Sequence, residues 1–418
     1  MLKKVSLSCW IFSVVVTLFM MSCIKDINVG NLQYLPMAVY IIYCLLNCRI
    51  KVDNEFKKFM IFYIPLFILF PTVQTLVRGR LLIMSNMVLY TIVTLYAYFV
   101  TLDIWKRNNV EYYYIIFYLI SNVIFLIQFL SNPSELFNFE SYKLIFNPDL
   151  RTNIGYNFTS TNTLGALCFG SLVISDFIKP QNNKFKIIIW ISRIFILLML
   201  LSTGSRTSLI CLIVYLISKF ILRVLYRFIK YKKPLYMKII LMIILSIYII
   251  FIFKTYPFDV IDRYTSYRLS GWIDSINYIM DNFGVFGIGL LNPNTLFHTV
   301  LRGELNNRLT ADNWYIYMFI SCSYIGILAA FLIINNFINQ CFNALNGLNI
   351  KEFSMIFSFL ISKIVYSLFE ISFFTPSDIN SIMMIIMIFS FNKNYNIYKY
   401  LNYKIIHKRR WIWTSLVR

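Results

Sequence analysis

The chain is a succession of long apolar runs separated by short polar segments. Runs of about 17 to 25 residues match the length that a helix needs to cross a ~30 Å hydrocarbon core. The pattern gives twelve candidate spans, at 7–23, 33–48, 59–77, 81–102, 111–131, 161–178, 187–202, 207–222, 237–255, 313–338, 353–372 and 377–391. Because the runs lack the two-residue alternation of barrel strands, they predict an all-α polytopic membrane protein.

The polar segments are loops between spans and do not mark domain boundaries. No linker, soluble domain or repeat is evident, so one membrane domain over residues 1–418 is expected. Two insertions are expected on the outer side: a first outer loop at 132–160 and a long outer loop at 256–312, between the ninth and tenth spans. Residues 392–418 form a basic tail, which we assign to the cytoplasm.

Composition and charge agree with a membrane protein. Hydrophobic residues make up 59% of the chain and charged residues 14%, too few polar groups for the surface of a soluble globule. With a cytoplasmic N-terminus, 26 of the 39 basic residues fall in inner segments and 11 in outer ones, as the positive-inside rule requires. Topology and anionic lipid thus account for the net charge of +21, and no nucleic-acid partner is expected.

The outer basic residues are mostly arginine, 8 of 11 against 7 of 26 on the inner side. Arginine's planar fork suits phosphate better than lysine's point charge. Arg206 lies in the short connector 202–208, Ser-Thr-Gly-Ser-Arg-Thr-Ser, which offers it no carboxylate neighbour. We therefore expect an anionic ligand at Arg206. The arginines of the long outer loop have an alternative, because they could bind lipid headgroups or pair with Asp259, Asp262 and Glu304.

The long outer loop contains an amphipathic pattern and a glycine-rich turn. Apolar residues between Leu269 and Met280 recur at spacings of three and four, which predicts a helix on the membrane surface. The sequence Gly284-Val-Phe-Gly287-Ile-Gly289 follows it. Glycines there permit tight turns, and their backbone N–H groups could help the arginines enclose a diphosphate.

Four short motifs in a fixed order give these features a family context. They are Arg151 to Gly165 before the sixth span, 202–208 between spans, Arg268-Leu-Ser-Gly-Trp272 continuing to Gly289, and Asp312-Asn313 at the start of the tenth span. In this order the motifs resemble the O-antigen polymerase and O-antigen ligase superfamily. The resemblance covers residues 150 to about 391, while the first five spans match only in hydropathy.

The resemblance implies a metal-independent, inverting glycosyltransferase in the bacterial cytoplasmic (inner) membrane, acting at the periplasmic face on oligosaccharides linked to undecaprenyl diphosphate. The membrane lipids and a chain-length regulator would be further partners. Family arginines bind the diphosphate, a role that maps onto Arg206, Arg268 and Arg151, and the loop position of Arg263 adds it to this set. No Asp-x-Asp or histidine cluster suggests an outer metal, and no cofactor is expected.

The transfer also needs a base for the attacking sugar hydroxyl. The leading candidates are Asp312, at the junction of loop and span, and His298, the one outer histidine, with Glu304 and Asp274 as further alternatives. Asp312 has the competing role of a helix N-cap. Asn313, Glu370, Gly287 and Gly289 are expected to line the substrate cavity. Glu370 would share one face of the eleventh helix with Lys363 and Ser367, whose structural alternative is pairing with each other or with a neighbouring helix.

Three functions remain in competition. The leading hypothesis is a polymerase that joins lipid-linked oligosaccharide repeats of a lipopolysaccharide or capsule. A ligase would use the same diphosphate site but transfer the glycan to another acceptor. Family ligases have His-Asn where this chain has Asp312-Asn313, which favours the polymerase. A flippase or polysaccharide transporter also has about twelve spans, but it needs no long outer loop and usually shows a repeat of halves.

Overall fold

The computed structural model describes residues 6–25, 27–47, 52–107, 109–137, 156–180, 182–231, 257–264, 268–297, 300–301, 312–344 and 350–391. These residues are built from helices joined by turns, and extended pairing among them is limited to an isolated bridge between Ile24 and Phe158. The all-α prediction is therefore confirmed for this part of the chain. The expected span at 237–255 and the tail 392–418 lie outside it.

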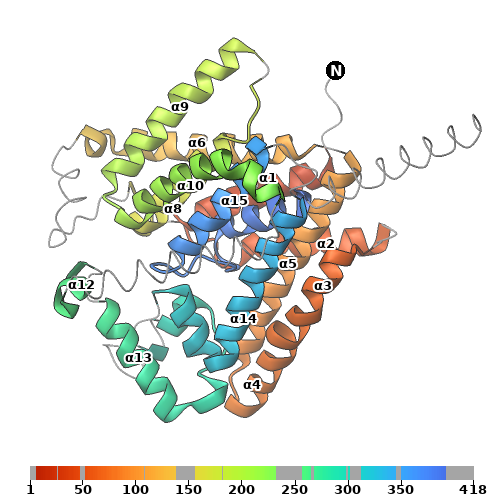
Figure 1. Ribbon diagram of the computed structural model, residues 1–418, viewed down its shortest axis with the longest axis vertical. Coiled ribbons are helices and arrows are strands. Elements are labelled where there is room, and N and C mark those ends of the chain that lie inside the picture. Colours follow the sequence, from red (N-terminus) through yellow and green to blue (C-terminus); the bar gives the residue numbers. More distant parts are fainter. Residues whose placement is uncertain are drawn as a thin grey trace, which may run out of the picture.

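The helices follow the predicted apolar runs closely (Figure 1). Their bounds are α1 (Leu7–Ser22), α2 (Leu35–Asn47), α3 (Asn54–Tyr63), α4 (Phe70–Arg78), α5 (Leu81–Arg107), α6 (Val110–Ser131), α8 (Thr161–Ser175), α9 (Asn183–Ser202), α10 (Arg206–Tyr231), α12 (Phe258–Tyr264), α13 (Arg268–Asn282), α14 (Trp314–Ala344) and α15 (Ile350–Tyr366). A last described helix runs over Ile379–Phe391. A π-helical turn, Ile64–Leu69, joins α3 to α4.

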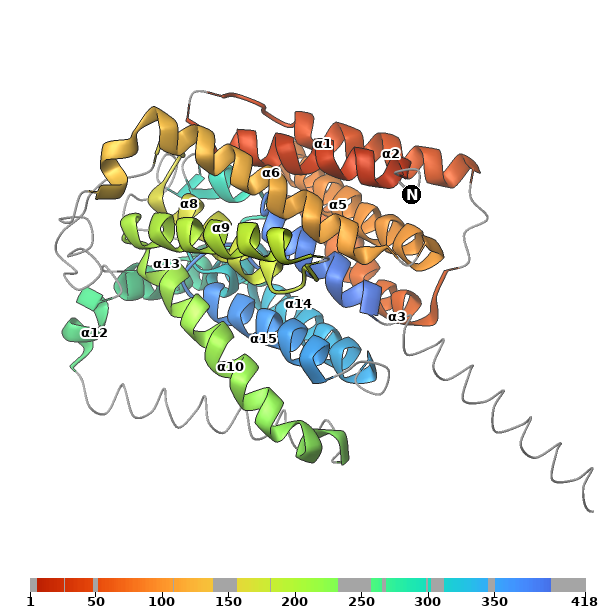
Figure 2. The same cartoon turned by 90° about the horizontal axis from the view of Figure 1, so that it is seen from above.

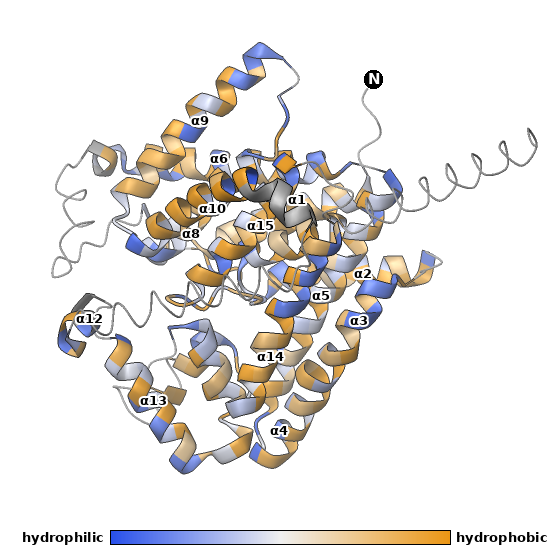
Figure 3. Cartoon of the chain, viewed as in Figure 1, coloured by the Kyte–Doolittle hydropathy of each residue, from blue (hydrophilic) through white to orange (hydrophobic). Residues whose placement is uncertain are grey.

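Six helical segments of the described chain are long and apolar enough to cross a membrane. They are Asn54–Arg78, Leu81–Arg107, Val110–Ser131, Asn183–Ser202, Arg206–Val224 and Trp314–Ala344. Apolar residues predominate along α9 and α10, as the colouring in Figure 3 shows, and many of their side chains are exposed. Trp190, Ile213 and Phe220 are examples of large exposed side chains on these helices. Such a surface suits lipid rather than water. The count of twelve spans stays a prediction.

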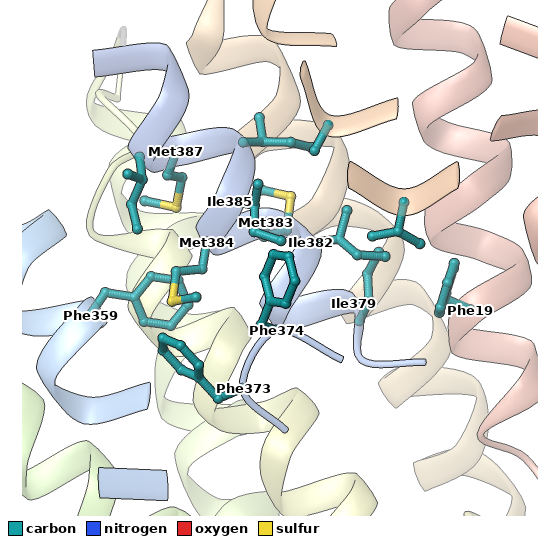
Figure 4. Close-up of a cluster of buried hydrophobic side chains, with 14 of the residues drawn as sticks. Phe19, Phe359, Phe373, Phe374, Ile379, Ile382, Met383, Met384, Ile385 and Met387 are labelled. Atoms are coloured by element: carbon teal, nitrogen blue, oxygen red, sulfur yellow. The ribbon is translucent and has the colours of Figure 1, made fainter. Parts of the chain in front are cut away.

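The helices pack around a core of aromatic and aliphatic side chains. α10 lies along α15, α8 packs against α6, α9 and α10, and α14 contacts α3, α13 and α15. Seen from above, α1 and α2 lie on the opposite side of the bundle from α10 (Figure 2). Phe373 and Phe374, from the turn after α15, insert beneath the last helix beside Phe359, Ile382 and Met384 (Figure 4). This packing anchors the connection between α15 and the last helix in the core.

α14 is broken near its first third, where Ser323 adopts φ +52°. The break leaves carbonyl groups that cannot pair within the helix. The amides of Ile288 and Gly289 donate to the carbonyl oxygens of Ile320 and Ser321 at 3.0 and 2.9 Å, and Gln74 Nε2 also donates to Ser321 at 2.8 Å. The broken helix is thereby closed by the segment that follows α13.

The helix predicted after Leu269 is confirmed as α13, which ends before Gly284 (φ +55°), while its position on the membrane surface stays a prediction. Its buried row is Gly271, Ser275 and Ile279, whereas Ile273 and Met280 are exposed. The predicted apolar face is thus correct only in part.

The eleventh helix is shorter than predicted, since α15 ends at Tyr366. The prediction that Lys363, Ser367 and Glu370 share one helix face is therefore wrong. Glu370 lies instead in the turn that joins α15 to the last helix.

Candidate functional site

Side chains from the separate sequence motifs meet at one end of the bundle, where α8, α10 and α14 begin and α15 ends. We call it the site end. The contacts form a continuous chain: Ser205 Oγ lies 3.3 Å from Asn162 Oδ1, and Asn162 Nδ2 donates to Glu370 Oε1 at 2.7 Å. Glu370 Oε1 also lies 3.4 Å from Arg268 Nη1, and Arg268 Nε lies 3.6 Å from Asp312 Oδ2. Five regions far apart in sequence thus build one cluster.

Glu370 is at the centre of this cluster. Its side chain is 22% exposed and lies beyond the end of α15. Burial is the main cause that raises the pKa of Glu370, to about 7, and the nearby charge of Asp312 acts in the same direction. Arg268 and the amide of Asn162 oppose that rise because they favour the charged carboxylate. The carboxyl group therefore changes its charge near neutral pH.

Arg268 is the first residue of α13 and is largely held by the protein. Its Nη1 donates to the backbone oxygen of Phe369 in addition to its contacts with Glu370 and Asp312. Asp262, one of the loop carboxylates, accepts from the amide of Ser270 in the first turn of α13 at 3.1 Å. Arg268 fixes the spacing between the two carboxylates and the end of α15.

The N-cap of α14 is Asn313, and the capping role considered for Asp312 is therefore wrong. Asn313 Oδ1 accepts from the amides of Tyr315 and Ile316 at 2.8 and 3.3 Å. Its Nδ2 donates to the carbonyl oxygen of Leu368 at 2.8 Å. Asn313 thus joins the start of α14 to the end of α15. Asp312, 33% exposed, is left to face Arg268.

Arg206 is the first residue of α10 and follows a tight turn. Gly204 has φ +63°, and the amide of Ser205 donates to Thr203 Oγ1 at 3.2 Å. Arg206 is partly exposed and has no hydrogen-bond or ion-pair partner within the described part of the chain. Its neighbour Ser205 contacts Asn162, so the turn places Arg206 beside the cluster. Of the two described arginines at the site end, Arg206 is the one whose guanidinium remains free for a ligand.

Close packing of α8 on α10 fixes this turn. A Cβ atom added at Gly165 would lie 2.7 Å from both Ser205 Cβ and Ser208 Oγ. The glycine of the 151–165 motif therefore serves the contact between two helices. It brings Asn162, three residues earlier, within reach of both Ser205 and Glu370.

The two cavity glycines have a packing role that the sequence did not indicate. Gly287 (φ +61°) has no room for a Cβ atom, which would lie 2.6 Å from the Ser321 carbonyl oxygen. Gly289 (φ +121°) would place a Cβ atom 2.3 Å from Ile83 Cδ1. Because the Gly289 amide donates to Ser321, the expectation that it helps enclose a diphosphate does not hold. Gly287 thus brings this segment against broken α14, and Gly289 brings it against α5.

The structure does not describe the side chains of three further candidate site residues. His298 and Arg151 lie outside the described residues, and for Arg263 only the backbone, within α12, is described. Sequence reasoning missed Asn162 as a site residue, although it quoted the motif that contains it. The available signal was an amide side chain in the first turn of a span, next to a glycine that permits close helix packing.

Lys363 pairs with Asp378, the residue just before the last helix. Its Nζ lies 2.6 Å from Asp378 Oδ2, and the lysine side chain is 2% exposed. Asp378 also accepts from Ser381 Oγ at 2.8 Å and from the Asn380 amide at 3.0 Å. The alternative of a structural ion pair with a neighbouring helix therefore describes Lys363. The pair joins the two ends of the connection that carries Glu370.

Among the described residues, no group of three or more His, Cys, Asp or Glu side chains is placed to hold a metal ion. Comparison with models of known protein families gives no match, and comparison with curated protein sequences gives none either.

Proposed function

We propose that this protein is a membrane glycosyltransferase that transfers a glycan from a polyprenyl-diphosphate carrier, undecaprenyl diphosphate, to a sugar hydroxyl. In its leading form it is a polymerase that extends lipid-linked oligosaccharide repeats of a surface polysaccharide. The proposal includes the twelve-span topology, a bacterial cytoplasmic membrane and a site end facing the periplasm. The proposed orientation of the protein in the membrane follows from the basic residues, most of which are assigned to the inner side.

One observation carries the proposal: a free arginine lies beside a carboxylate pair that a second arginine holds. Arg206 would bind the leaving diphosphate by two parallel hydrogen bonds, since its guanidinium has no partner in the described chain. Arg268 adds positive charge at the same end but is shared with Glu370 and Asp312. The arrangement supplies a cation for the leaving group and carboxylates for the acceptor hydroxyl.

The ligase is the second form of the same proposal. It would use the same diphosphate site, and the Asp312-Asn313 pair in place of His-Asn favours the polymerase. Asn313 has a structural task at the helix ends, so the difference between the two forms concerns position 312.

Purified protein incubated with a synthetic polyprenyl-diphosphate repeat unit tests the proposal. A ladder of products supports the polymerase, transfer to an added acceptor supports the ligase, and absence of turnover with carrier binding supports transport. Arg206→Ala and Arg206→Lys should each reduce turnover about 10- to 100-fold, the equivalent of ~1.5–3 kcal/mol for charge-assisted hydrogen bonds, because lysine keeps the charge but loses the fork.

Arg223→Lys is the matched control. Arg223 lies on the same helix, and its Nε donates to Ser354 Oγ at 3.3 Å, away from the site end. Its replacement should leave turnover within about twofold of wild type. Equal turnover of Arg206→Lys and wild type would reduce Arg206 to a general positive charge.

A further inference from the structure

The two oxygen atoms of Glu370 are in different environments. Oε1 accepts from Asn162 Nδ2 at 2.7 Å and lies 3.4 Å from Arg268 Nη1. Oε2 makes no hydrogen bond with any described residue and is not among the buried atoms that lack a partner. One oxygen is thus held in place while the other remains accessible. A carboxylate with this arrangement can accept a proton without losing its orientation.

The charged and titratable groups around Glu370 come from each element packed against it. Arg268 is at the start of α13, Asp312 precedes α14, and Tyr366 is the last residue of α15. From α8 comes the neutral amide of Asn162. The two carboxylates flank a single arginine, which restrains both but cannot neutralise both. The environment separates them, because Glu370 is the more buried of the two and Asp312 the more exposed.

We propose that Glu370 is the general base of the transfer, with Asn162 and Arg268 as the residues that position it. The inference rests on the proposed function. It replaces Asp312 and His298 in the role that the sequence assigned to them. Asp312 acts on the base through its charge and through its contact with Arg268.

The step balances as an inverting displacement. The oxygen of the acceptor hydroxyl forms a bond to the anomeric carbon of the donor sugar, while the bond from that carbon to the diphosphate oxygen breaks. The electron pair of the broken bond goes to the diphosphate, whose charge the Arg206 guanidinium offsets. The hydroxyl proton goes to Glu370 Oε2. Release of that proton to water returns the carboxylate for another cycle.

The pH dependence distinguishes this base from the other candidates. A base acts in its ionised form, so kcat/KM of the wild type should rise with pH through about 7, the pKa of Glu370. Glu370→Gln retains an oxygen that can accept from Asn162 but cannot take a proton. It should lower turnover by about 10²-fold or more while leaving the Kd for polyprenyl diphosphate within about threefold of wild type.

Substitutions at two neighbours of Glu370 should shift the rising limb of the kcat/KM profile against pH in opposite directions. Asn162→Ala removes a hydrogen bond that favours the charged carboxylate, so the limb should move to higher pH. Asp312→Asn removes a negative charge that disfavours it, so the limb should move to lower pH, whatever its effect on the maximal rate. A purely structural role for either residue would change the rate without moving the limb.

The outcomes separate the two proposals. Wild-type protein that binds the carrier but never transfers a glycan contradicts the proposed function. Wild-type turnover together with near wild-type turnover of Glu370→Gln contradicts only the assignment of the base. If Glu370→Gln fails to fold, the Asn162 and Asp312 variants decide, since both retain Glu370. A limb that does not move in either variant overturns the inference.

Discussion

Removal of the buried Lys363 ammonium should destabilise the protein far more than removal of an exposed one. Lys363 and Asp378 are 2% and 16% exposed, and their charged atoms lie 2.6 Å apart. Lys363→Met keeps the volume of the side chain but leaves the carboxylate unpaired. Breaking a buried pair on one side costs about 3–5 kcal/mol. Asp378 retains hydrogen bonds from Ser381 and Asn380, so we expect the lower end, about 3 kcal/mol.

A double variant measures the interaction itself. Lys363→Met with Asp378→Asn removes the unpaired charge, and asparagine can still accept the hydrogen bonds at the start of the last helix. The double variant should recover about 1–2 kcal/mol of the summed single losses. Lys58→Met is the matched control, because Lys58 pairs with Glu55 at 2.7 Å but is 63% exposed. That exposed pair should contribute about 0–1 kcal/mol.

The free energy of unfolding can be followed by reversible denaturation in mixed micelles of sodium dodecyl sulfate, with tryptophan fluorescence as the signal. Two results would refute the reasoning. If Lys363→Met destabilises the protein no more than Lys58→Met, burial does not make the pair costly to break. Strictly additive losses in the double variant would show that the two groups do not interact energetically.

Two further predictions concern packing and topology. Gly165→Ala should gain about 1 kcal/mol of helix propensity but lose about 1–3 kcal/mol to the overlap with Ser205 and Ser208. Both the free energy of unfolding and the turnover should therefore fall. A more stable and fully active variant would contradict this prediction. In a background without native cysteines, Ile145→Cys and Thr295→Cys should react with an impermeant thiol reagent in intact spheroplasts, whereas Lys232→Cys should not. Labelling at position 232 alone would show that the topology is the reverse of the predicted one.

The fold was predictable from the sequence wherever helices obey local rules. Apolar run length predicted most of the described helices, and the three-and-four spacing after Leu269 predicted α13. The end of α15 was not predictable in this way, since residues 367–372 remain apolar enough to continue a span. The helix ends at Tyr366 because Trp314, Asn313 and Arg268 satisfy the carbonyls of the next residues, which are contacts distant in sequence.

In the site, too, some features could be predicted from local sequence and others depend on contacts between distant residues. The motifs assigned Arg206, Arg268 and Asp312 to one proposed site, and the structure brings Arg268 and Asp312 into contact. The roles within the cluster depended on three-dimensional pairing. Gly287 and Gly289 carry a sequence suited to ligand binding, yet their surroundings are the backbone of α14 and the side chain of Ile83. No local pattern distinguishes a glycine that approaches a ligand from one that approaches another helix.

The amide of Asn313 restricts what evolution can place at that position. Its oxygen accepts from two amides of α14, while its nitrogen donates to a carbonyl of the segment after α15. Aspartate would present an oxygen to that carbonyl and repel it, and serine is too short to reach both partners. Glutamine carries both groups but places them one methylene too far away. Two helix ends therefore require asparagine at this position. We expect it to be retained even in a relative that had lost catalytic activity.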